Sequence, residues 1–153
     1  MEEILHRPRR SVLYVPGSNE KAHSKIPTLD VDALIYDLED AVAPAAKDQA
    51  RLAIISLVNS NQNSKKEQVV RLNSDDNEFG KKDYEVLEKC EPDAILIPKV
   101  TAPEDVLKYV PYLQNKKTMI RAMMETPHAI INANDIASVS YTHLRAHETP
   151  EHL

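Results

Sequence analysis

The chain has 153 residues, 42% of them hydrophobic and 28% charged, which is the composition of a globular protein long enough to bury one core. The net charge of −5 gives little support for nucleic acid as a partner, and no apolar run reaches the length of a membrane span or has the pattern of a signal peptide. The single cysteine excludes an internal disulfide and a cysteine-based zinc site, so we expect a cytoplasmic protein.

The first predicted elements are a strand and a short helix. Residues 11–15 form an apolar run that ends at the turn Pro16-Gly17. Ser18 follows and is a favourable residue for capping the start of a helix, because its hydroxyl can accept a backbone N–H.

The second predicted strand, residues 33–37, is apolar without polar alternation, which is typical of a strand covered on both faces in a parallel sheet. Asp37, Glu39 and Asp40 crowd its C-terminal end. Parallel α/β proteins place their ligands at that end of their strands. The three carboxylates therefore indicate a metal or a cationic group of a substrate.

Three further strands and four further helices are expected along the chain. The strands are residues 68–72, 93–97 and 118–124, and the helices run from 44 to about 57, around 84–90, from 103 to 109, and from 128 to about 137, with a polar loop at 59–66. Successive strands begin roughly 20 to 35 residues apart, which suits right-handed βαβ units. No hairpin signal such as Asn-Gly separates them.

These elements predict an α/β fold with a parallel sheet and outer helices. Its closed form is the (β/α)₈ TIM barrel, and the chain supplies about five βα units of such a barrel before it stops. An open, doubly wound sheet of five strands is the alternative. With Gly17 and Gly80 as its only glycines, the chain has no glycine-rich phosphate loop of either common kind.

The last residues, 139–153, differ from the rest of the chain. They hold three of the six histidines and show no helical or strand period. The string VSYTHLRAHET (139–149) resembles the translation of a transposon-type sequencing adapter. We therefore expect a partial barrel domain over 1–138 and a non-native tail over 139–153 that makes no long-range contact. A natural disordered C-terminus is the alternative, and we assign no function to the three histidines.

Charged side chains also follow the later strands, and in a parallel sheet they would meet at one edge. Arg71 lies between two apolar residues of a strand, where a guanidinium needs an anionic partner. Glu125 follows an apolar strand, and its carboxylate needs a cation or hydrogen-bond donors there. Asn73 and Lys99 follow the third and fourth strands.

Each of these residues also has a purely structural interpretation. Asp40 could favour the start of the next helix through the helix dipole, and Lys99 could be a solvated loop residue. Glu39 could pair with Lys47 or Arg51 on that helix. Charge at so many strand ends together makes the functional interpretation the better one.

The chain resembles the HpcH/HpaI aldolase/citrate lyase superfamily, in particular its citrate lyase β-subunit and malyl-CoA lyase group. The resemblance covers residues 10 to about 137 and rests on ordered motifs: RSVLYVPG (10–17), DALIYDLEDAVAP (32–44) with Lys47 and Arg51, VRLN (70–73), FG (79–80), DAILIPKV (93–100) and METP (124–127).

This resemblance implies a (β/α)₈ barrel, a homo-oligomer, and Mg²⁺ as cofactor. It implies that Glu125 is a catalytic metal ligand and that Arg71 is a catalytic residue that holds a substrate carboxylate. Further residues implied in the substrate pocket are Pro16, Gly17, Glu39, Asp40 and Lys99, with Glu39 and Asp40 reaching the metal through water. The family's second metal ligand, an aspartate on the sixth strand, has no counterpart in this chain.

The implied reaction of the parent protein is carbon–carbon bond cleavage in a citryl or malyl thioester, which gives an acetyl thioester and a 2-oxo acid. The acyl carrier would be coenzyme A or an acyl carrier protein, with no nucleic-acid or membrane partner. Two alternatives remain open. One is a class II aldolase that acts on free 2-oxo acids, and the other is an inert truncated fragment; the 153 residues alone are expected to be inactive.

Overall fold

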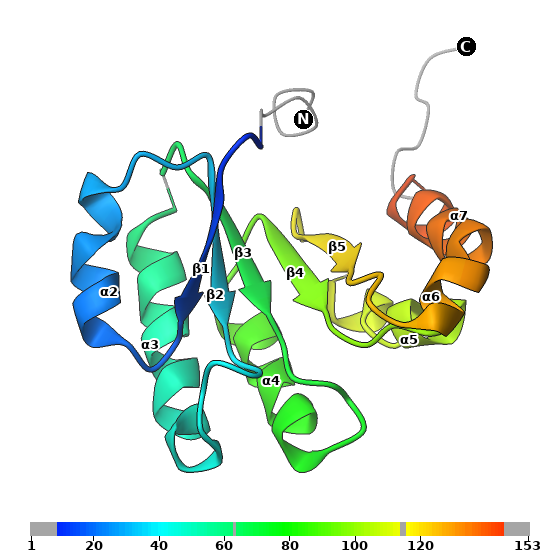
Figure 1. Cartoon of the computed structure of the whole chain (residues 1–153), viewed down its shortest axis with the longest axis horizontal. Helices are drawn as coiled ribbons and strands as arrows, with labels where there is room; N and C mark the ends of the chain where they lie inside the picture. The colour runs from blue at the N-terminus through cyan, green and yellow to red at the C-terminus, as the bar shows by residue number, and fades with distance from the viewer. Residues whose placement is uncertain (1–8, 63, 114–115, 146–153) are drawn as a thin grey trace.

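The computed structural model describes residues 9–62, 64–113 and 116–145, and it contains one parallel sheet. Its strands lie side by side in chain order, and every neighbouring pair is parallel (Figure 1). They are β1 (Val12–Pro16), β2 (Ala33–Asp37), β3 (Glu67–Arg71), β4 (Ala94–Ile97) and β5 (Met119–Ala122). The predicted parallel α/β fold is therefore confirmed, with all five strands near their expected positions.

Helical segments connect the strands, with α2, α3 and α4 on one side of β1 to β4 and the last three helices gathered beyond β5 (Figure 1). The α-helices are α2 (Glu20–Lys25), α3 (Lys47–Ser60), α4 (Glu78–Lys89), α5 (Pro103–Leu107), α6 (Pro127–Ile131) and α7 (Ala133–Arg145), and the 3₁₀ helices are η1 (Ile26–Thr28), η2 (Pro44–Ala46) and η3 (Val110–Leu113). Within the described ranges, none of the helices has both the length and the apolar character needed to cross a membrane.

The two faces of the sheet carry different clusters because successive side chains of a strand point to opposite faces. The main core joins one face to the helices, with fully buried residues such as Tyr36, Ile54 and Leu87. The other face holds a smaller cluster that contains strand residues and Met123 but no helix residue: Ile35, Val69, Ala94, Leu96 and Met119. This one-sided arrangement is that of a barrel segment, because a doubly wound sheet has helices on both faces.

Two helix starts differ from the sequence-based expectation. Asn19, not Ser18, caps α2, because the Asn19 side chain accepts a hydrogen bond from the Ala22 N–H. Helix α4 begins earlier than expected, at Glu78, because the Asn77 side chain accepts hydrogen bonds from the first N–H groups of the helix. In both cases an asparagine in the preceding loop sets the start.

The end of the chain also differs from the expectation. The last helix is divided at Asn132 into α6 and α7, and α7 continues to Arg145 instead of ending near residue 137. Val139 is half-buried and packs against the main core, three residues after the buried Ile136. The expectation that the tail has no helical period and no long-range contact is wrong at this point, since Val139 extends the apolar stripe of the helix. His147 and His152 lie outside the described residues.

Gly80, in the first turn of α4, is in close contact with the loop that follows β3. A Cβ atom at this position would lie 2.1 Å from the Ser74 carbonyl oxygen and 2.8 Å from the Asp75 Cα. Both are backbone atoms, which cannot move aside as a flexible side chain can. The absence of a side chain at Gly80 therefore lets this loop pass directly over the helix.

Gly80→Ala is expected to lower the free energy of unfolding by about 3 kcal/mol, because the added methyl group overlaps main-chain atoms. Urea unfolding of the purified chain measures the change. Lys81→Ala, at an exposed position in the same turn, is the matched control and should change stability by less than about 0.5 kcal/mol. Equal stabilities of the two variants would show that the loop is not constrained by this contact.

Candidate functional site

The site is built around Asp37, which ends β2 and is 1% exposed. Its carboxylate accepts hydrogen bonds from the N–H of Glu39 at 2.8 Å and from the N–H of Ala41 at 3.2 Å, which folds the following loop back over the strand end. Burial would raise the pKa of Asp37, but hydrogen bonds from Arg71 and from these N–H groups outweigh that effect and hold the pKa below its usual range. Asp37 is therefore the anion that organises the end of β2.

Arg71 ends β3 and binds Asp37 with two parallel hydrogen bonds, from Nε at 2.8 Å and from Nη2 at 2.6 Å. Its guanidinium also lies over the Tyr14 ring, 5.2 Å from the centroid. The hydrogen bonds that Arg71 donates to Asp37 raise the pKa of Arg71 further above its already high value. Arg71 thus has the anionic partner that its place in a strand requires.

This pair limits what Arg71 can do for a ligand. The bidentate edge predicted to grip a substrate carboxylate is occupied by Asp37, and Nη1 is directed elsewhere, at 3.2 Å from the Glu39 carboxylate and 3.8 Å from the Asp40 carboxylate. Binding of a substrate carboxylate by Arg71 stays a prediction, and only the Nη1 group is in a position to make that contact.

Glu39 has a buried carboxylate between two cations. Lys99 Nζ lies 3.0 Å from Oε1 and Arg71 Nη1 lies 3.2 Å from Oε2. Both contacts are ion pairs by distance, yet neither is aligned as a hydrogen bond, so both carboxylate oxygens are buried without a hydrogen-bond donor. The Glu39 carboxylate pairs with neither Lys47 nor Arg51: Lys47 binds only the backbone carbonyl of Glu39, and Arg51 binds Asp83.

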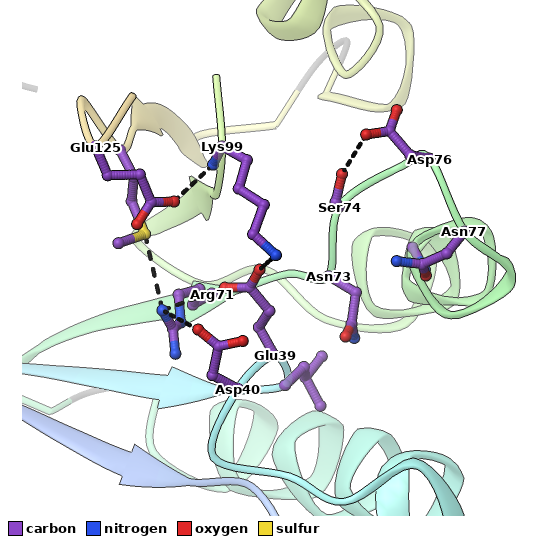
Figure 2. Close-up of polar contacts among 12 residues, drawn as sticks. Glu39, Asp40, Arg71, Asn73, Ser74, Asp76, Asn77, Lys99 and Glu125 are labelled. Carbon is purple, nitrogen blue, oxygen red and sulfur yellow. Dashed lines mark hydrogen bonds and ion pairs between the residues drawn. The ribbon is translucent and has the colours of Figure 1, made fainter. Parts of the chain in front are cut away.

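Lys99 joins two of the acids through different atoms (Figure 2). Its backbone N–H donates to Glu125 Oε1 at 2.7 Å, while its ammonium group reaches Glu39. The Glu39 carboxylate raises the pKa of Lys99. Lys99 has φ of 53°, and it is the only residue other than glycine with positive φ in the described part of the chain. This left-handed conformation is strained for a side chain that has a Cβ.

The structure therefore brings Glu39, Arg71, Lys99 and Glu125 together at the C-terminal ends of four strands (Figure 2). Asp40 lies at the margin with a side chain 73% exposed, seven positions before α3, so it does not act on the start of that helix. The alternative interpretation of Lys99 as a solvated loop residue is wrong, because its N–H binds Glu125 and its ammonium group pairs with Glu39.

The turn Pro16-Gly17 is attached to the same strand end, because the Gly17 N–H donates to the Asp37 carbonyl at 2.8 Å. A surface pocket opens beside this turn, and its lining residues are Pro16, Ser18, Asn19, Glu20, Lys21 and Ala41. None of the four clustered charged residues lines it. The turn is thus next to the site but faces a separate hollow.

The role of Asp37 was missed by the sequence-based interpretation, which treated it as one of three equivalent acids. The available signal was its position: Asp37 is the last residue of its strand and Arg71 is the last residue of the next strand along the chain. The two are direct partners in the sheet register.

Magnesium is the metal that the resemblance implies, and the described acids suit part of a magnesium site. The Glu39 oxygens are buried without donors, and the exposed Glu125 carboxylate lies close by through Lys99. Mg²⁺ prefers hard oxygen ligands and keeps several waters, so one or two carboxylates fit it. Within the described ranges, no group of three His, Cys, Asp or Glu residues is arranged to hold a metal ion.

Comparison with known proteins places the chain in a family. The sequence profile of the HpcH/HpaI aldolase/citrate lyase family matches residues 10–145. A protein named (3S)-malyl-CoA thioesterase from Cereibacter sphaeroides is 42% identical over 134 residues, which are 86% of this chain and 45% of that protein. The citrate lyase subunit beta of Haemophilus influenzae is 35% identical over 141 residues, 86% of this chain and 48% of that protein.

A solved structure shows the same fold. The citrate lyase beta subunit from M. tuberculosis, complexed with oxaloacetate and magnesium, superimposes with a TM-score of 0.68 at 26% identity, over 86% of this chain and 55% of that one. This likeness agrees with the parallel α/β fold described above. The chain belongs to the HpcH/HpaI aldolase/citrate lyase family. It spans about half the length of the curated relatives that it matches.

Asp37→Asn is expected to lower the free energy of unfolding at pH 7 by about 3 kcal/mol, because it removes the charged, two-point partner of the buried Arg71 and leaves only the contacts of Nη1 with Glu39 and Asp40. The folded-state pKa of Asp37 lies below the ordinary value of 3.8, so its contribution is present above that pH and is lost as the pH falls through the folded pKa. The difference between wild type and variant should narrow on acidification below about pH 4.

Urea unfolding at a series of pH values measures this difference. Glu85→Gln is the control, because Glu85 forms an ion pair with Lys89 between two side chains at the protein surface, and its loss should cost far less. A stability difference for Asp37→Asn that stays constant with pH would contradict the account of this ion pair.

Lys99→Gly and Lys99→Ala both remove the ammonium group, but only glycine relieves the left-handed backbone. The glycine variant should be more stable than the alanine variant by about 1 kcal/mol, which thermal unfolding can measure. If alanine is equally stable at this position, the backbone there carries no strain.

Proposed function

We propose that this chain supplies the acid-binding side of the active site in a Mg²⁺-dependent carbon–carbon lyase. The reaction is cleavage of a 3-hydroxyacyl thioester, such as malyl-CoA, to an acetyl thioester and a 2-oxo acid. The whole protein would be cytoplasmic and homo-oligomeric, and it would need sequence beyond the half that this chain matches. Membership in a family with citrate lyase supports the proposal.

The observation that carries the proposal is the convergence of opposite charges at the strand ends. Glu39 lies within 3.2 Å of two cations, and one of these, Lys99, also holds Glu125 through its backbone. Such a group of alternating charges suits a ligand that presents both a carboxylate and a metal ion.

In this proposal each residue has a limited role. Glu125 would hold Mg²⁺ directly, Glu39 and Asp40 would reach it through water, and bound Mg²⁺ would supply Lewis-acid polarisation of the hydroxy or oxo acid oxygens. Arg71 Nη1 and the Lys99 ammonium attract the carboxylate of the acid and orient it. Asp37 keeps the Arg71 plane fixed, so that this group is in place before the substrate binds.

The bond changes are those of a retro-Claisen cleavage. The hydroxyl of the substrate loses its proton, the carbon–carbon bond breaks, and the hydroxyl carbon becomes the carbonyl of the 2-oxo acid. The electron pair passes to the thioester as an enolate, which takes up a proton to give the acetyl thioester. The described residues provide the oxo-acid side, where fixed charges stabilise the developing product.

Thioester hydrolysis is the second candidate reaction, because the relative with 42% identity is named a thioesterase. Hydrolysis of malyl-CoA would release free coenzyme A and malate, and no carbon–carbon bond would break. Aldol chemistry on free 2-oxo acids and an inert fragment are the remaining alternatives. The products from malyl-CoA distinguish the lyase from the thioesterase, and a second assay with a free 2-oxo acid distinguishes an aldolase from an inert protein.

The test uses a protein that contains this chain and extends to the length of its relatives, with malyl-CoA and Mg²⁺. We expect acetyl-CoA and glyoxylate in equal amounts, with glyoxylate detected as its phenylhydrazone and free thiol measured separately. Release of free thiol without glyoxylate would favour the thioesterase. Acetyl-CoA release by the 153 residues alone would show that the remaining half of the site is not needed.

Glu125→Gln should lower kcat/KM by roughly 100-fold, the size expected for one electrostatic group in an active site. Arg71→Lys should raise KM for the acid and lower stability, because lysine cannot reproduce the fork on Asp37. Arg121→Lys is the matched control, since Arg121 binds Glu67 near the opposite end of the sheet. A KM for Arg71→Lys equal to that of the control would remove Arg71 from substrate binding.

A further inference from the structure

Lys47, the first residue of α3, has a buried ammonium group directly behind the site. Nζ donates to the Leu38 carbonyl at 2.7 Å, to the Glu39 carbonyl at 2.9 Å and to Asn73 Oδ1 at 2.6 Å. It also lies 5.3 Å from the centroid of the Phe79 ring. All three N–H bonds of the ammonium therefore have acceptors, and two of those acceptors belong to the backbone that carries Glu39.

The position of Lys47 is unfavourable for the helix itself. A cation in the first turn of a helix faces the positive end of the helix dipole. Lys47 is only 6% exposed, and burial lowers its pKa. A lysine there costs free energy unless its contacts compensate. Helix formation therefore does not explain this residue, whereas the three contacts with the loops after β2 and β3 do.

A second set of buried groups holds Asn73, the side chain that accepts from Lys47. Asp83, on α4 and fully buried, accepts hydrogen bonds from Asn73 N at 2.7 Å and from Asn73 Nδ2 at 2.8 Å. Arg51, one turn after Lys47 on α3, donates to Asp83 from Nε at 3.0 Å and from Nη2 at 2.9 Å. Asn73 thus holds Lys47, Asp83 holds Asn73, and Arg51 holds Asp83.

The Glu39 backbone is consequently held from two sides. Asp37 accepts its N–H from the sheet side, and Lys47 binds its carbonyl from the helix side. With both peptide groups fixed, the Glu39 side chain is directed toward Arg71 and Lys99, where its oxygens have no hydrogen-bond donor. The direction of this carboxylate depends on the loop. The Glu39 carbonyl also accepts the Val42 N–H at 3.2 Å, within the same loop, and Lys47 is the group that ties this carbonyl to Asn73.

We propose that Lys47 is a positioning residue, which sets the direction of the Glu39 carboxylate by clamping the Leu38 and Glu39 carbonyls to Asn73. The clamp is a property of this chain, and its effect on turnover rests on the proposed lyase function. Lys47 contacts neither substrate nor metal in this account. Its loss acts through the loop after β2.

Hydrogen exchange of the 153-residue chain tests the clamp without any assumption about activity. In Lys47→Met, the Glu39 and Ala41 amides, which donate to Asp37, should exchange at least tenfold faster relative to the most protected core amides. Val58→Ala, on the same helix and fully buried, is the control: it lowers global stability without touching this loop. Unchanged relative exchange in Lys47→Met would overturn the clamp.

If Lys47→Met does not fold, Lys47→Gln replaces it, because glutamine is polar and shorter and cannot reach all three acceptors; it should show the same local effect at reduced size. Turnover is then measured in the longer protein. The proposal expects kcat/KM to fall at least tenfold for the Lys47 variant and less than threefold for Val58→Ala. Faster exchange with unchanged turnover would overturn the positioning role, while absence of lyase activity in the wild type would reject the proposed function alone.

Discussion

The ion pair between Asp37 and Arg71 is the interaction on which the rest of the site depends. The two residues are direct partners in the β2–β3 register, so correct pairing of the strands brings the carboxylate and the guanidinium together. A shift of one residue would turn Arg71 to the helix-covered face of the sheet, where it would displace a core residue. Pairing of these two strands and assembly of the site are therefore the same event.

Other features of the site follow from this pair. Asp37 also accepts the Glu39 and Ala41 N–H groups, so the loop that carries Glu39 takes its shape from the same carboxylate. Arg71 in turn leaves Nη1 directed at Glu39, and Lys99 completes the group from the β4 end. The site is a set of charges held by buried backbone contacts, which keeps reorganisation on ligand binding small.

The strands β2 and β4 were predictable because their sequences are apolar without alternation, as the exact match of residues 33–37 to β2 shows. Glu39, Arg71, Lys99 and Glu125 were also predictable as a group, since the C-terminal ends of parallel strands meet at one edge. Their partners were not predictable. Which acid binds Arg71 depends on register, and which carbonyl binds Lys47 depends on the packing of a helix against two loops.

The predicted starts of α2 and α4 were wrong because of local capping contacts. Asn19 and Asn77 cap α2 and α4, and neither stands out in a sequence with several polar residues near each boundary. The predicted end of the last helix was wrong because of a tertiary contact: α7 continues past residue 137, and Val139 packs against the main core. The positive φ of Lys99 was not predictable either, because lysine is not a residue that favours the left-handed conformation.

The most direct test of the account is a titration of the chain with Mn²⁺, a paramagnetic substitute for Mg²⁺, followed by NMR. The account predicts that the amide signals of Glu39, Lys99 and Glu125 broaden together before those elsewhere, that added Mg²⁺ reverses the broadening, and that Glu125→Gln abolishes it. Broadening centred on another part of the chain, or unaffected by Glu125→Gln, would contradict a metal site at these strand ends.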